Sequence, residues 1–146
     1  MTNKQFTYKY PRPAVSTDAV ILKKGTAEIL LIRRGNEPFK NQWALPGGFV
    51  NMDEVLADAC IRELKEETGL VVDNLEQFKV YDAVDRDPRE RILSVVFYGF
   101  VEKDAQVKGA DDAAEAAWFK MDQLPDLAFD HEQIIFDFLG LLGQSR

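Results

Sequence analysis

The run "DEVLADACIRELKEETG", residues 53–69, repeats apolar side chains at a constant interval. Leu56, Cys60 and Leu64 recur every four residues, so in a helix their side chains share one face. A helix with one apolar face is stable when that face packs on a core. The run therefore predicts an amphipathic helix over residues 53–68.

Both ends of this helix are marked by suitable residues. Asp53 and Glu54 stand at its N-terminus, where the helix dipole favours negative charge. Gly69 stands where glycine commonly ends a helix, because it adopts the left-handed conformation without strain. The acidic residues at the start and the glycine at the end therefore support a helix that begins at Asp53 and ends before Gly69.

Three carboxylates, which we call the helix glutamates, project from one side of this helix: Glu63, Glu66 and Glu67. A solvated charged face is the commonest role of such a run. However, Glu63 and Glu67 form a like-charge i,i+4 pair, which costs about 0.2–0.5 kcal/mol in an isolated helix. Mg²⁺ binds carboxylate oxygens and is commonly shared with substrate phosphates. The glutamates are therefore candidate metal ligands.

Composition limits the classes of protein to consider. The chain has 146 residues, 46% apolar and 29% charged, which suits one globular domain over residues 1–146. Cys60 is the single cysteine, so an internal disulfide and a cysteine-based zinc cluster are excluded. One histidine likewise excludes an H-E-x-x-H metal site. Any bound metal is expected to have oxygen ligands.

Charge and hydropathy limit the partners. The formal net charge of −7 argues against a nucleic-acid polymer, which requires clustered lysine and arginine. The first residues contain no apolar signal-peptide core, and no apolar run approaches the roughly 18 residues of a membrane span. We therefore expect a cytoplasmic protein with no membrane partner.

Outside the helix, β-rich runs alternate with loops rich in glycine, proline or charge. A second helix is expected at the C-terminal end, with Asp130 and Gln133 in the spacing of a capping box. The order of elements predicts an α+β fold with a mixed sheet between helices. The strands are expected at residues 14–24, 27–34, 75–84, 91–103 and 115–121, the loop at 35–48 and the helix at 130–142, with an apolar face of Ile134, Ile135, Phe138, Leu139 and Leu142.

Residues 48–70, "GFVNMDEVLADACIRELKEETGL", match every fixed position of the motif G-x5-E-x7-R-E-U-x-E-E-x-G-U. The chain therefore resembles the Nudix hydrolase family, whose fold is an α/β/α sandwich. The matching positions are Gly48, Glu54, Arg62, Glu63, Leu64, Glu66, Glu67, Gly69 and Leu70.

The resemblance implies hydrolysis of a nucleoside diphosphate linked to another group, with Mg²⁺ or Mn²⁺ as cofactor. The helix glutamates would be the metal ligands, directly or through water, and the backbone carbonyl of Gly47 would add another oxygen. Glu54 and Arg62 would pair and brace the preceding loop against the helix. A plain surface ion pair is the alternative for these two residues.

The general base is expected outside the motif, in residues 109–119, "GADDAAEAAWF". Asp112 and Glu115 are the first candidates, because the family often places its base on a loop before a late strand. Glu63 is the alternative within the motif. Each acid could instead be an ordinary solvated side chain.

The whole pattern looks like the ADP-ribose pyrophosphatase-like branch, which cleaves ADP-ribose to AMP and ribose 5-phosphate. Pro88 stands later after the motif than the proline of several ADP-ribose enzymes, and the SQPWPFPxS marker of NADH-cleaving relatives is absent. Candidate substrate contacts are Arg33, Arg34 and Arg89 for phosphate, and Phe39, Trp43 and Phe49 for stacking on the base, although each aromatic could belong to the core.

Residues 85–91, "DRDPRER", form a charged loop whose role stays open. Its arginines would either close over the terminal ribose phosphate or only solvate a hairpin. His131 follows Asp130 and is interpreted as a helix-start residue and not as the base, with a place near the mouth of the pocket as the alternative.

Two other functions remain open. The first is a pyrophosphohydrolase that acts on a (deoxy)nucleoside triphosphate and releases pyrophosphate. The second is a non-catalytic sensor of ADP-ribose-type ligands, although only four residues follow Leu142, so we expect no fused DNA-binding domain. The family is often dimeric, which makes a homodimer one candidate assembly.

Overall fold

A mixed β-sheet between two helices forms the body of the molecule. The computed structural model describes residues 5–109 and 113–144. The sheet runs in the order β3-β2-β1-β6-β5, with β4 paired to β1 and β7 paired to β2. The elements are β1 (Ala14–Lys23), β2 (Glu28–Arg34), β3 (Trp43–Ala44), β4 (Gly47–Phe49), α1 (Leu56–Thr68), β5 (Glu76–Tyr81), β6 (Ile92–Val101), β7 (Ala113–Lys120) and α2 (His131–Gln144).

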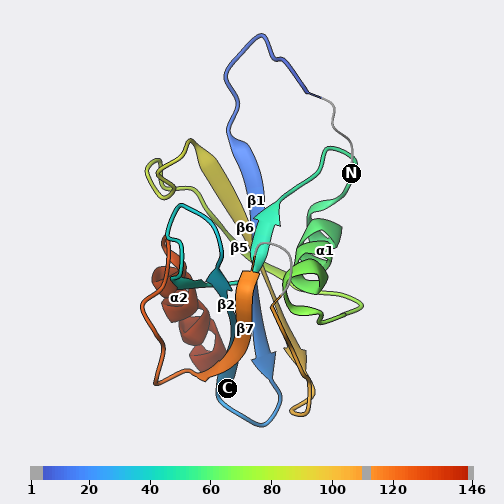
Figure 1. The fold of residues 1–146 in the computed structure, drawn as a ribbon, viewed down its shortest axis with the longest axis vertical. Coiled ribbons are helices and arrows are strands. Elements are labelled where there is room, and N and C mark those ends of the chain that lie inside the picture. Colours follow the sequence, from blue (N-terminus) through green and yellow to red (C-terminus); the bar gives the residue numbers. More distant parts are fainter. Residues whose placement is uncertain (1–4, 110–112, 145–146) are drawn as a thin grey trace.

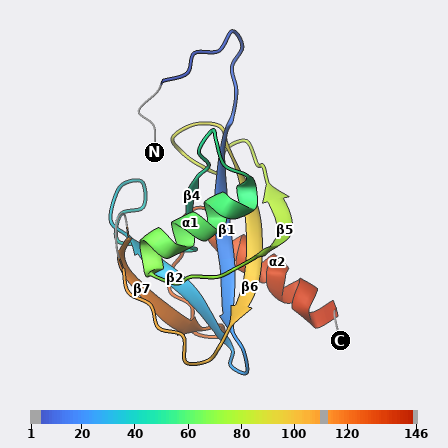
Figure 2. The ribbon, with the colours of Figure 1, turned by 90° about the vertical axis from the view of Figure 1, so that its right-hand side faces the viewer.

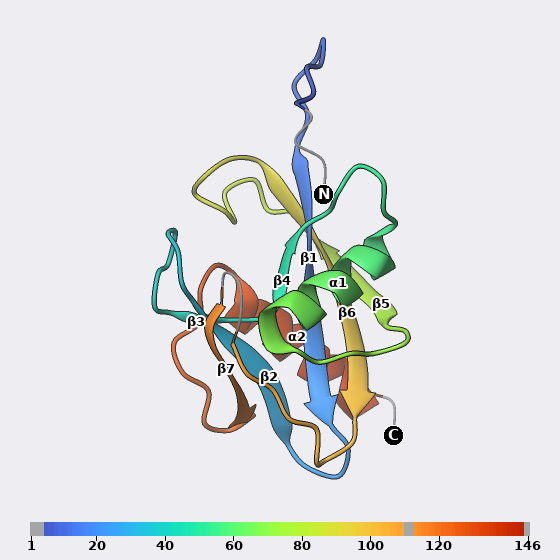
Figure 3. The same ribbon diagram turned by 45° about the vertical axis from the view of Figure 1, so that its right-hand side comes forward.

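The sheet is mixed because one central pair is parallel. β1 and β6 run parallel from Ala14 opposite Ile92 to Lys23 opposite Val101, whereas the other pairs between strands are antiparallel. Figure 1 views the sheet with α1 on one side and α2 on the other, and Figure 3 shows the two helices on opposite faces. This arrangement confirms the α+β fold with a mixed sheet between helices.

Alternating side chains of β1 divide the core into two layers. Val20 and Leu22 point towards α2, and Ala19 and Ile21 point towards α1, because successive strand residues face opposite sides. Figure 2 shows α1 lying across β1 and β6. The α2 layer includes Ile29, Leu31, Val96, Ile134, Ile135 and Phe138; the α1 layer includes Leu30, Cys60, Leu64, Val95 and Phe97.

Helix α1 starts later than the sequence predicted, at Leu56 instead of Asp53. The carboxylate of Glu54 accepts a hydrogen bond from the backbone N–H of Asn51 at 2.9 Å and also binds Arg62, so the preceding residues form a turn. The predicted C-terminus is confirmed. Gly69 has a φ of +77°, and its N–H donates to the carbonyl of Lys65 at 2.8 Å.

The segment predicted as a loop, residues 35–48, also contains β3 and the start of β4. These strands are very short, so their sequences carry no recognisable period. At Gly47 a Cβ atom would collide with the backbone carbonyl oxygen of Thr17. Glycine at this position therefore allows β4 to pair closely with β1.

Helix α2 contradicts the predicted capping box. Both carboxylate oxygens of Asp130 accept from Arg86, at 2.9 and 2.7 Å, and Gln133 donates to Asp137 at 2.7 Å. Leu139, predicted on the apolar face, is 38% exposed. Within the part of the chain that the structure describes, neither helix is long and apolar enough to cross a membrane.

Candidate active site

The helix glutamates line a cavity of about 600 Å³ between α1, β4 and β2, which we call the glutamate cavity. The motif places four charged side chains of α1 on this wall, because residues 62, 63, 66 and 67 share one helical face. The opposite walls come from other elements. Besides the helix glutamates, the cavity is lined by Ile32, Arg34, Asn36, Glu37, Gly47, Gly48, Phe49, Asn51, Arg62 and Arg89.

Arg62 connects the carboxylates on this wall. Its guanidinium lies 2.6 Å from Glu54, 2.8 Å from Glu63 and 3.1 Å from Glu66. It also donates to the backbone carbonyl of Phe49 at 3.1 Å. The hydrogen bonds from Arg62 hold the pKa of Glu54 below its ordinary value. Arg62 thereby ties the chain that leaves β4 to helix α1.

The two glycines of β4 bring the backbone directly against the carboxylates. Glu67 is 6% exposed and accepts a hydrogen bond from the N–H of Gly47 at 2.8 Å. At Gly48 an added Cβ atom would lie 2.5 Å from Oε2 of Glu63. A side chain at Gly48 would therefore displace Glu63, which explains the need for glycine there.

The oxygen donors of this wall fit a hard divalent cation, because Glu63, Glu66 and Glu67 are carboxylates beside the backbone of Gly47. Within residues 5–109 and 113–144, however, no three acidic, histidine or cysteine side chains are arranged to hold a metal ion. Arg62 engages Glu63 and Glu66 in this structure. An incoming cation would therefore compete with Arg62 for these two carboxylates.

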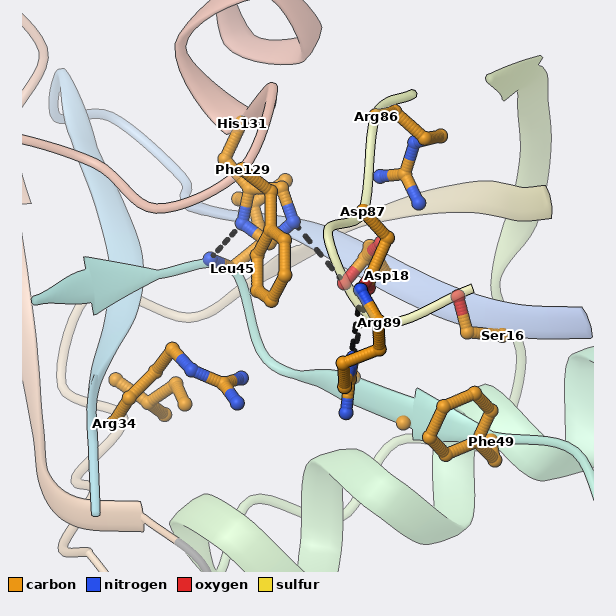
Figure 4. A pocket seen from close by; sticks show the side chains of 13 residues that line it. Ser16, Asp18, Arg34, Leu45, Phe49, Arg86, Asp87, Arg89, Phe129 and His131 are labelled. Carbon is orange, nitrogen blue, oxygen red and sulfur yellow. Dashed lines mark hydrogen bonds and ion pairs between the residues drawn. The ribbon is translucent and has the colours of Figure 1, made fainter. Parts of the chain in front are cut away.

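A second and smaller cavity of about 50 Å³ adjoins the first, and we call it the inner pocket. Figure 4 shows its side chains converging from β1, β2, the 85–91 loop and the start of α2. Ser16, Asp18, Leu45, Arg86, Asp87, Phe129 and His131 line the inner pocket alone; Ile32, Arg34, Gly47, Gly48, Phe49 and Arg89 line both cavities.

Two arginines stand at the junction of the cavities. Arg34 lies 4.9 Å from the ring centroid of Phe129, and Arg89 lies 5.3 Å from that of Phe49 and 5.8 Å from that of Phe129. Burial lowers the pKa of Arg34, and the nearby charge of Arg89 lowers it further. Two adjacent positive charges favour an anion between them, so the junction suits phosphate.

Aromatic and acidic residues orient these arginines. Asp87 accepts from Nε of Arg89 at 3.0 Å and from its Nη2 at 2.8 Å. Phe129 has a φ of +54°, a conformation uncommon for an aromatic residue, and its ring lies against both arginines. Arg86 binds Asp130 and so holds the 85–91 loop against the start of α2.

His131 forms part of the floor of the inner pocket and is 3% exposed. Its Nδ1 accepts a hydrogen bond from the N–H of Leu45 at 3.0 Å, so the neutral ring carries its proton on Nε2. Nε2 lies 3.6 Å from Oδ1 of Asp18. The hydroxyl of Ser94 donates to the other oxygen of Asp18. His131 does begin a helix, as the sequence indicated, but it also reaches the pocket.

Several predicted site residues do not line either cavity. Arg33 pairs with Glu115 at 3.0 Å, and the Glu115 side chain is 54% exposed. Phe39 packs edge-on against Phe129, and Trp43 packs in the same way against Phe119. Asp112 lies outside the described residues. Of the predicted substrate contacts, Arg34, Phe49 and Arg89 line the cavities.

The sequence analysis missed Asp18 and Asp87, and it gave a place at the pocket to His131 only as an alternative. A usable signal exists for Asp18, which is an acid within the otherwise β-rich run of residues 14–24. A charged residue inside a buried strand needs a partner, so such a position is a candidate functional residue. Asp87 carries no comparable local signal.

Comparison with known proteins identifies the family. A family model described as NUDIX domain matches residues 12–138. An ADP-ribose pyrophosphatase of Methanocaldococcus jannaschii is 48% identical over 130 residues, which cover 89% of this chain and 75% of that protein. The ADPR responsive transcriptional repressor NtrR of Acinetobacter baylyi is 35% identical over 132 residues, which cover 86% of this chain and 53% of the repressor.

Comparison with a solved structure shows that the fold is also similar. The bifunctional NMN adenylyltransferase/ADP ribose pyrophosphatase of Francisella tularensis, complexed with AMP and a Mn ion, is 31% identical, with a TM-score of 0.83. The match covers 91% of this chain and 43% of that one, so this chain corresponds to part of the bifunctional protein. Since the family model spans most of the sequence and the Methanocaldococcus relative is similar over nearly all of it, the chain belongs to the Nudix hydrolase family.

Proposed function

We propose that this protein hydrolyses the diphosphate linkage of ADP-ribose to AMP and ribose 5-phosphate, with Mg²⁺ or Mn²⁺ as cofactor. The observation that carries the proposal is a single cavity lined by three carboxylates of α1 and by Arg34 and Arg89. The Methanocaldococcus and Francisella relatives, both named as ADP-ribose pyrophosphatases, support this choice of substrate.

The residues of the glutamate cavity would have three functions, which are binding the cation, binding phosphate and contacting the adenine ring. The helix glutamates and the carbonyl of Gly47 would hold the divalent cation, which supplies positive charge to the diphosphate and activates water. Arg34 and Arg89 would bind phosphate oxygens from the other wall. A water oxygen then bonds to one phosphorus, and the bridging oxygen leaves with the other phosphate. Phe49, which is exposed and lines the cavity, would provide a surface for the adenine ring.

Arg62 would keep the reactive carboxylates in place. It contacts Glu54, Glu63 and Glu66, and through the carbonyl of Phe49 it also holds the end of β4. If Glu63 and Glu66 held a cation, the pair of Arg62 with Glu54 would still brace the loop. Arg62 is thus a positioning residue in this proposal.

The general base stays a prediction, and its candidates differ in their surroundings. Glu63 lines the glutamate cavity, whereas Glu115 points to Arg33 and lines neither cavity. Asp112 lies outside the described residues and stays a candidate for the general base. Of the two candidates that the structure describes, Glu63 is the one that lines the cavity.

One alternative is a sensor that binds ADP-ribose without cleaving it. The similarity to the ADPR responsive repressor of Acinetobacter favours this alternative, because 86% of the present chain aligns with that repressor. Cleavage of a nucleoside triphosphate remains the alternative within hydrolases. It would use the same cation and glutamates but release pyrophosphate.

Product analysis separates the three functions. The purified protein is incubated with ADP-ribose or dGTP, with Mg²⁺, Mn²⁺ or a chelator, and the products are separated by ion-exchange chromatography. We expect AMP and ribose 5-phosphate from ADP-ribose and no product with the chelator. Pyrophosphate from dGTP alone would replace the proposed substrate. Bound but uncleaved ADP-ribose would support the sensor.

The remaining expectations about the protein also stay proposals. They are a single domain over residues 1–146, a homodimer and a cytoplasmic location. Size-exclusion chromatography with light scattering would measure the assembly directly. A mass close to twice the 16.6 kDa of the chain is the result expected for a homodimer.

A further inference from the structure

The chain that enters helix α2 is fixed to the segment around β3 on both sides of Asp130. The N–H of Ala128 donates to the carbonyl of Trp43 at 2.8 Å. Nδ1 of His131 accepts from the N–H of Leu45, the residue after β3, at 3.0 Å. These bonds leave the backbone around Asp130 little freedom, so its carboxylate has a defined position.

Asp130 forms a bidentate ion pair with Arg86 of the 85–91 loop. Its Oδ2 accepts from Nε of Arg86 at 2.9 Å, and its Oδ1 accepts from Nη2 at 2.7 Å. The Arg86 side chain is 4% exposed, whereas that of Asp130 is 23% exposed. A bidentate pair fixes orientation as well as distance, and a buried guanidinium requires such a partner. The pair therefore anchors the loop at Arg86.

The anchored loop in turn holds Arg89. Asp87 directly follows Arg86 and accepts from the N–H, Nε and Nη2 of Arg89 at 2.9, 3.0 and 2.8 Å. Figure 4 shows Arg86, Asp87 and Arg89 together on this loop. Because Asp87 adjoins the anchored residue, its position depends on the pair of Arg86 with Asp130. The direction of the Arg89 guanidinium depends on it as well.

The residue before Asp130 acts on the same guanidinium. Phe129 has a φ of +54°, in the left-handed region, and its ring centroid lies 5.8 Å from Arg89 and 4.9 Å from Arg34. A cation is attracted to the face of an aromatic ring at such distances. Two consecutive residues at the entry to α2 therefore restrain Arg89, one through its ring and the other through the 85–91 loop.

We propose that Asp130 is a positioning residue for phosphate binding, which acts through Arg86 and Asp87 to hold Arg89 in the orientation that binds the diphosphate. The inference rests on the proposed function, in which Arg89 binds phosphate oxygens. Asp130 lines neither the glutamate cavity nor the inner pocket, so its effect on the substrate is indirect.

The first test replaces Asp130 by asparagine, which keeps the size of the side chain and removes its charge. We expect the dissociation constant of ADP-ribose, measured by calorimetry with a chelator, and KM, measured with Mg²⁺, to rise about tenfold. The value of kcat should change less than about twofold, because phosphate binding is weakened equally in the ground state and the transition state. A role in folding alone would lower the midpoint of urea unfolding and leave the dissociation constant unchanged.

The matched control is Glu132→Gln. It changes an exposed acid in the first turn of α2 that lines neither cavity. This variant should leave the dissociation constant, KM and kcat unchanged.

The second test asks whether the effect of Asp130 passes through Arg89. The Asp130→Asn change is combined with Arg89→Gln, and the dissociation constant is compared with that of Arg89→Gln alone. Residues that act as one unit have non-additive effects, so the added change should raise the constant less than about twofold. Independent action would instead preserve the full increase seen in the wild-type background.

Two results would overturn the inference: an unchanged dissociation constant in folded Asp130→Asn, or a full increase that persists beside Arg89→Gln. If Asp130→Asn does not fold, Arg86→Met takes its place, because it removes the buried charge together with the ion pair. The same results are expected of it. A direct contact between Arg86 and the substrate would preserve its effect beside Arg89→Gln and would also overturn the inference.

The outcomes for the wild-type protein separate this inference from the proposed function. Binding of ADP-ribose without cleavage would refute the hydrolase function, and the dissociation constants of the variants would then decide the role of Asp130. No binding of ADP-ribose would refute both the function and the inference.

Discussion

The glutamate cavity and the inner pocket are neighbours, but they are assembled in different ways. The first takes the helix glutamates from α1 and its two glycines from β4, the strand just before that helix, so one segment, residues 47–67, provides all five of these residues. The second collects Asp18 from β1, Asp87 from a loop and His131 from α2. A site assembled from one continuous segment has a recognisable sequence, whereas a site assembled from three segments does not.

The two cavities also hold their charges differently. Glu54, Glu63 and Glu66 share a single cation, Arg62, at a partly exposed surface. In the inner pocket, each buried acid has its own partners, such as Ser94 for Asp18 and Arg89 for Asp87. A cation would therefore compete with Arg62 in the first cavity, whereas the acids of the second cavity are already held by hydrogen bonds within the protein.

The largest expected effect tests the glutamate cavity. Glu67→Gln should lower kcat by at least about two orders of magnitude, the usual range for removing a main electrostatic stabiliser. The amide oxygen still accepts from the N–H of Gly47, so folding should survive. Steady-state kinetics with ADP-ribose and circular dichroism measure both properties. The control is Glu76→Gln, which changes an exposed acid on β5. Unchanged turnover in folded Glu67→Gln would contradict the role of α1 as the metal-binding helix.

The next effect tests the fixed hydrogen bonds of the inner pocket. His131→Leu removes the acceptor for the buried N–H of Leu45 and should lower the free energy of unfolding by about 1–3 kcal/mol. His131→Asn keeps an oxygen close to the position of Nδ1 and should lose less. Urea denaturation of the three proteins gives the comparison. Equal losses in both variants would mean that packing of the ring, and not the hydrogen bond, stabilises this site.

A smaller effect concerns acid stability and Arg62. Because Arg62 depresses the pKa of folded Glu54, the unfolded chain takes up a proton there at higher pH than the folded chain does. The stabilisation is therefore present above the ordinary value of 4.5 and is lost as pH falls through the folded pKa. Urea denaturation across the acid range should show a shallower loss of stability in Glu54→Gln than in the wild type. If the free energy of unfolding fell equally steeply with pH in both proteins, the pair of Glu54 and Arg62 would contribute nothing to stability in acid.

The smallest expected effect tests whether Glu115 belongs to the active site. Glu115 pairs with Arg33 and lines neither cavity, so Glu115→Gln should change kcat by less than about twofold. The measurement is the pH profile of kcat for the variant and the wild type. A large loss of kcat with an altered basic or acidic limb would instead identify Glu115 as the general base.

The predictions from sequence that were wrong about the starts of α1 and α2 failed for related physical reasons. The predicted capping box of α2 failed because Asp130 binds Arg86, which lies far from it in the chain. The predicted start of α1 failed because Glu54 turns to bind Arg62 and the N–H of Asn51. In both cases a local preference was overruled by a charged partner. Trp43 and Phe39, proposed as stacking residues, instead pack against other aromatic side chains.

The sequence alone determined the mixed α+β fold, the helix that ends at Gly69, and the family, because each of these depends on periodicity or spacing within a continuous segment. The tertiary structure alone decided which arginines reach the site and that Asp18 and His131 meet in a buried pocket. The contact between Asp18 and His131 joins β1 to α2 on one face of the sheet. Local patterns carry no information about them, since a side chain's partner depends on how distant segments pack.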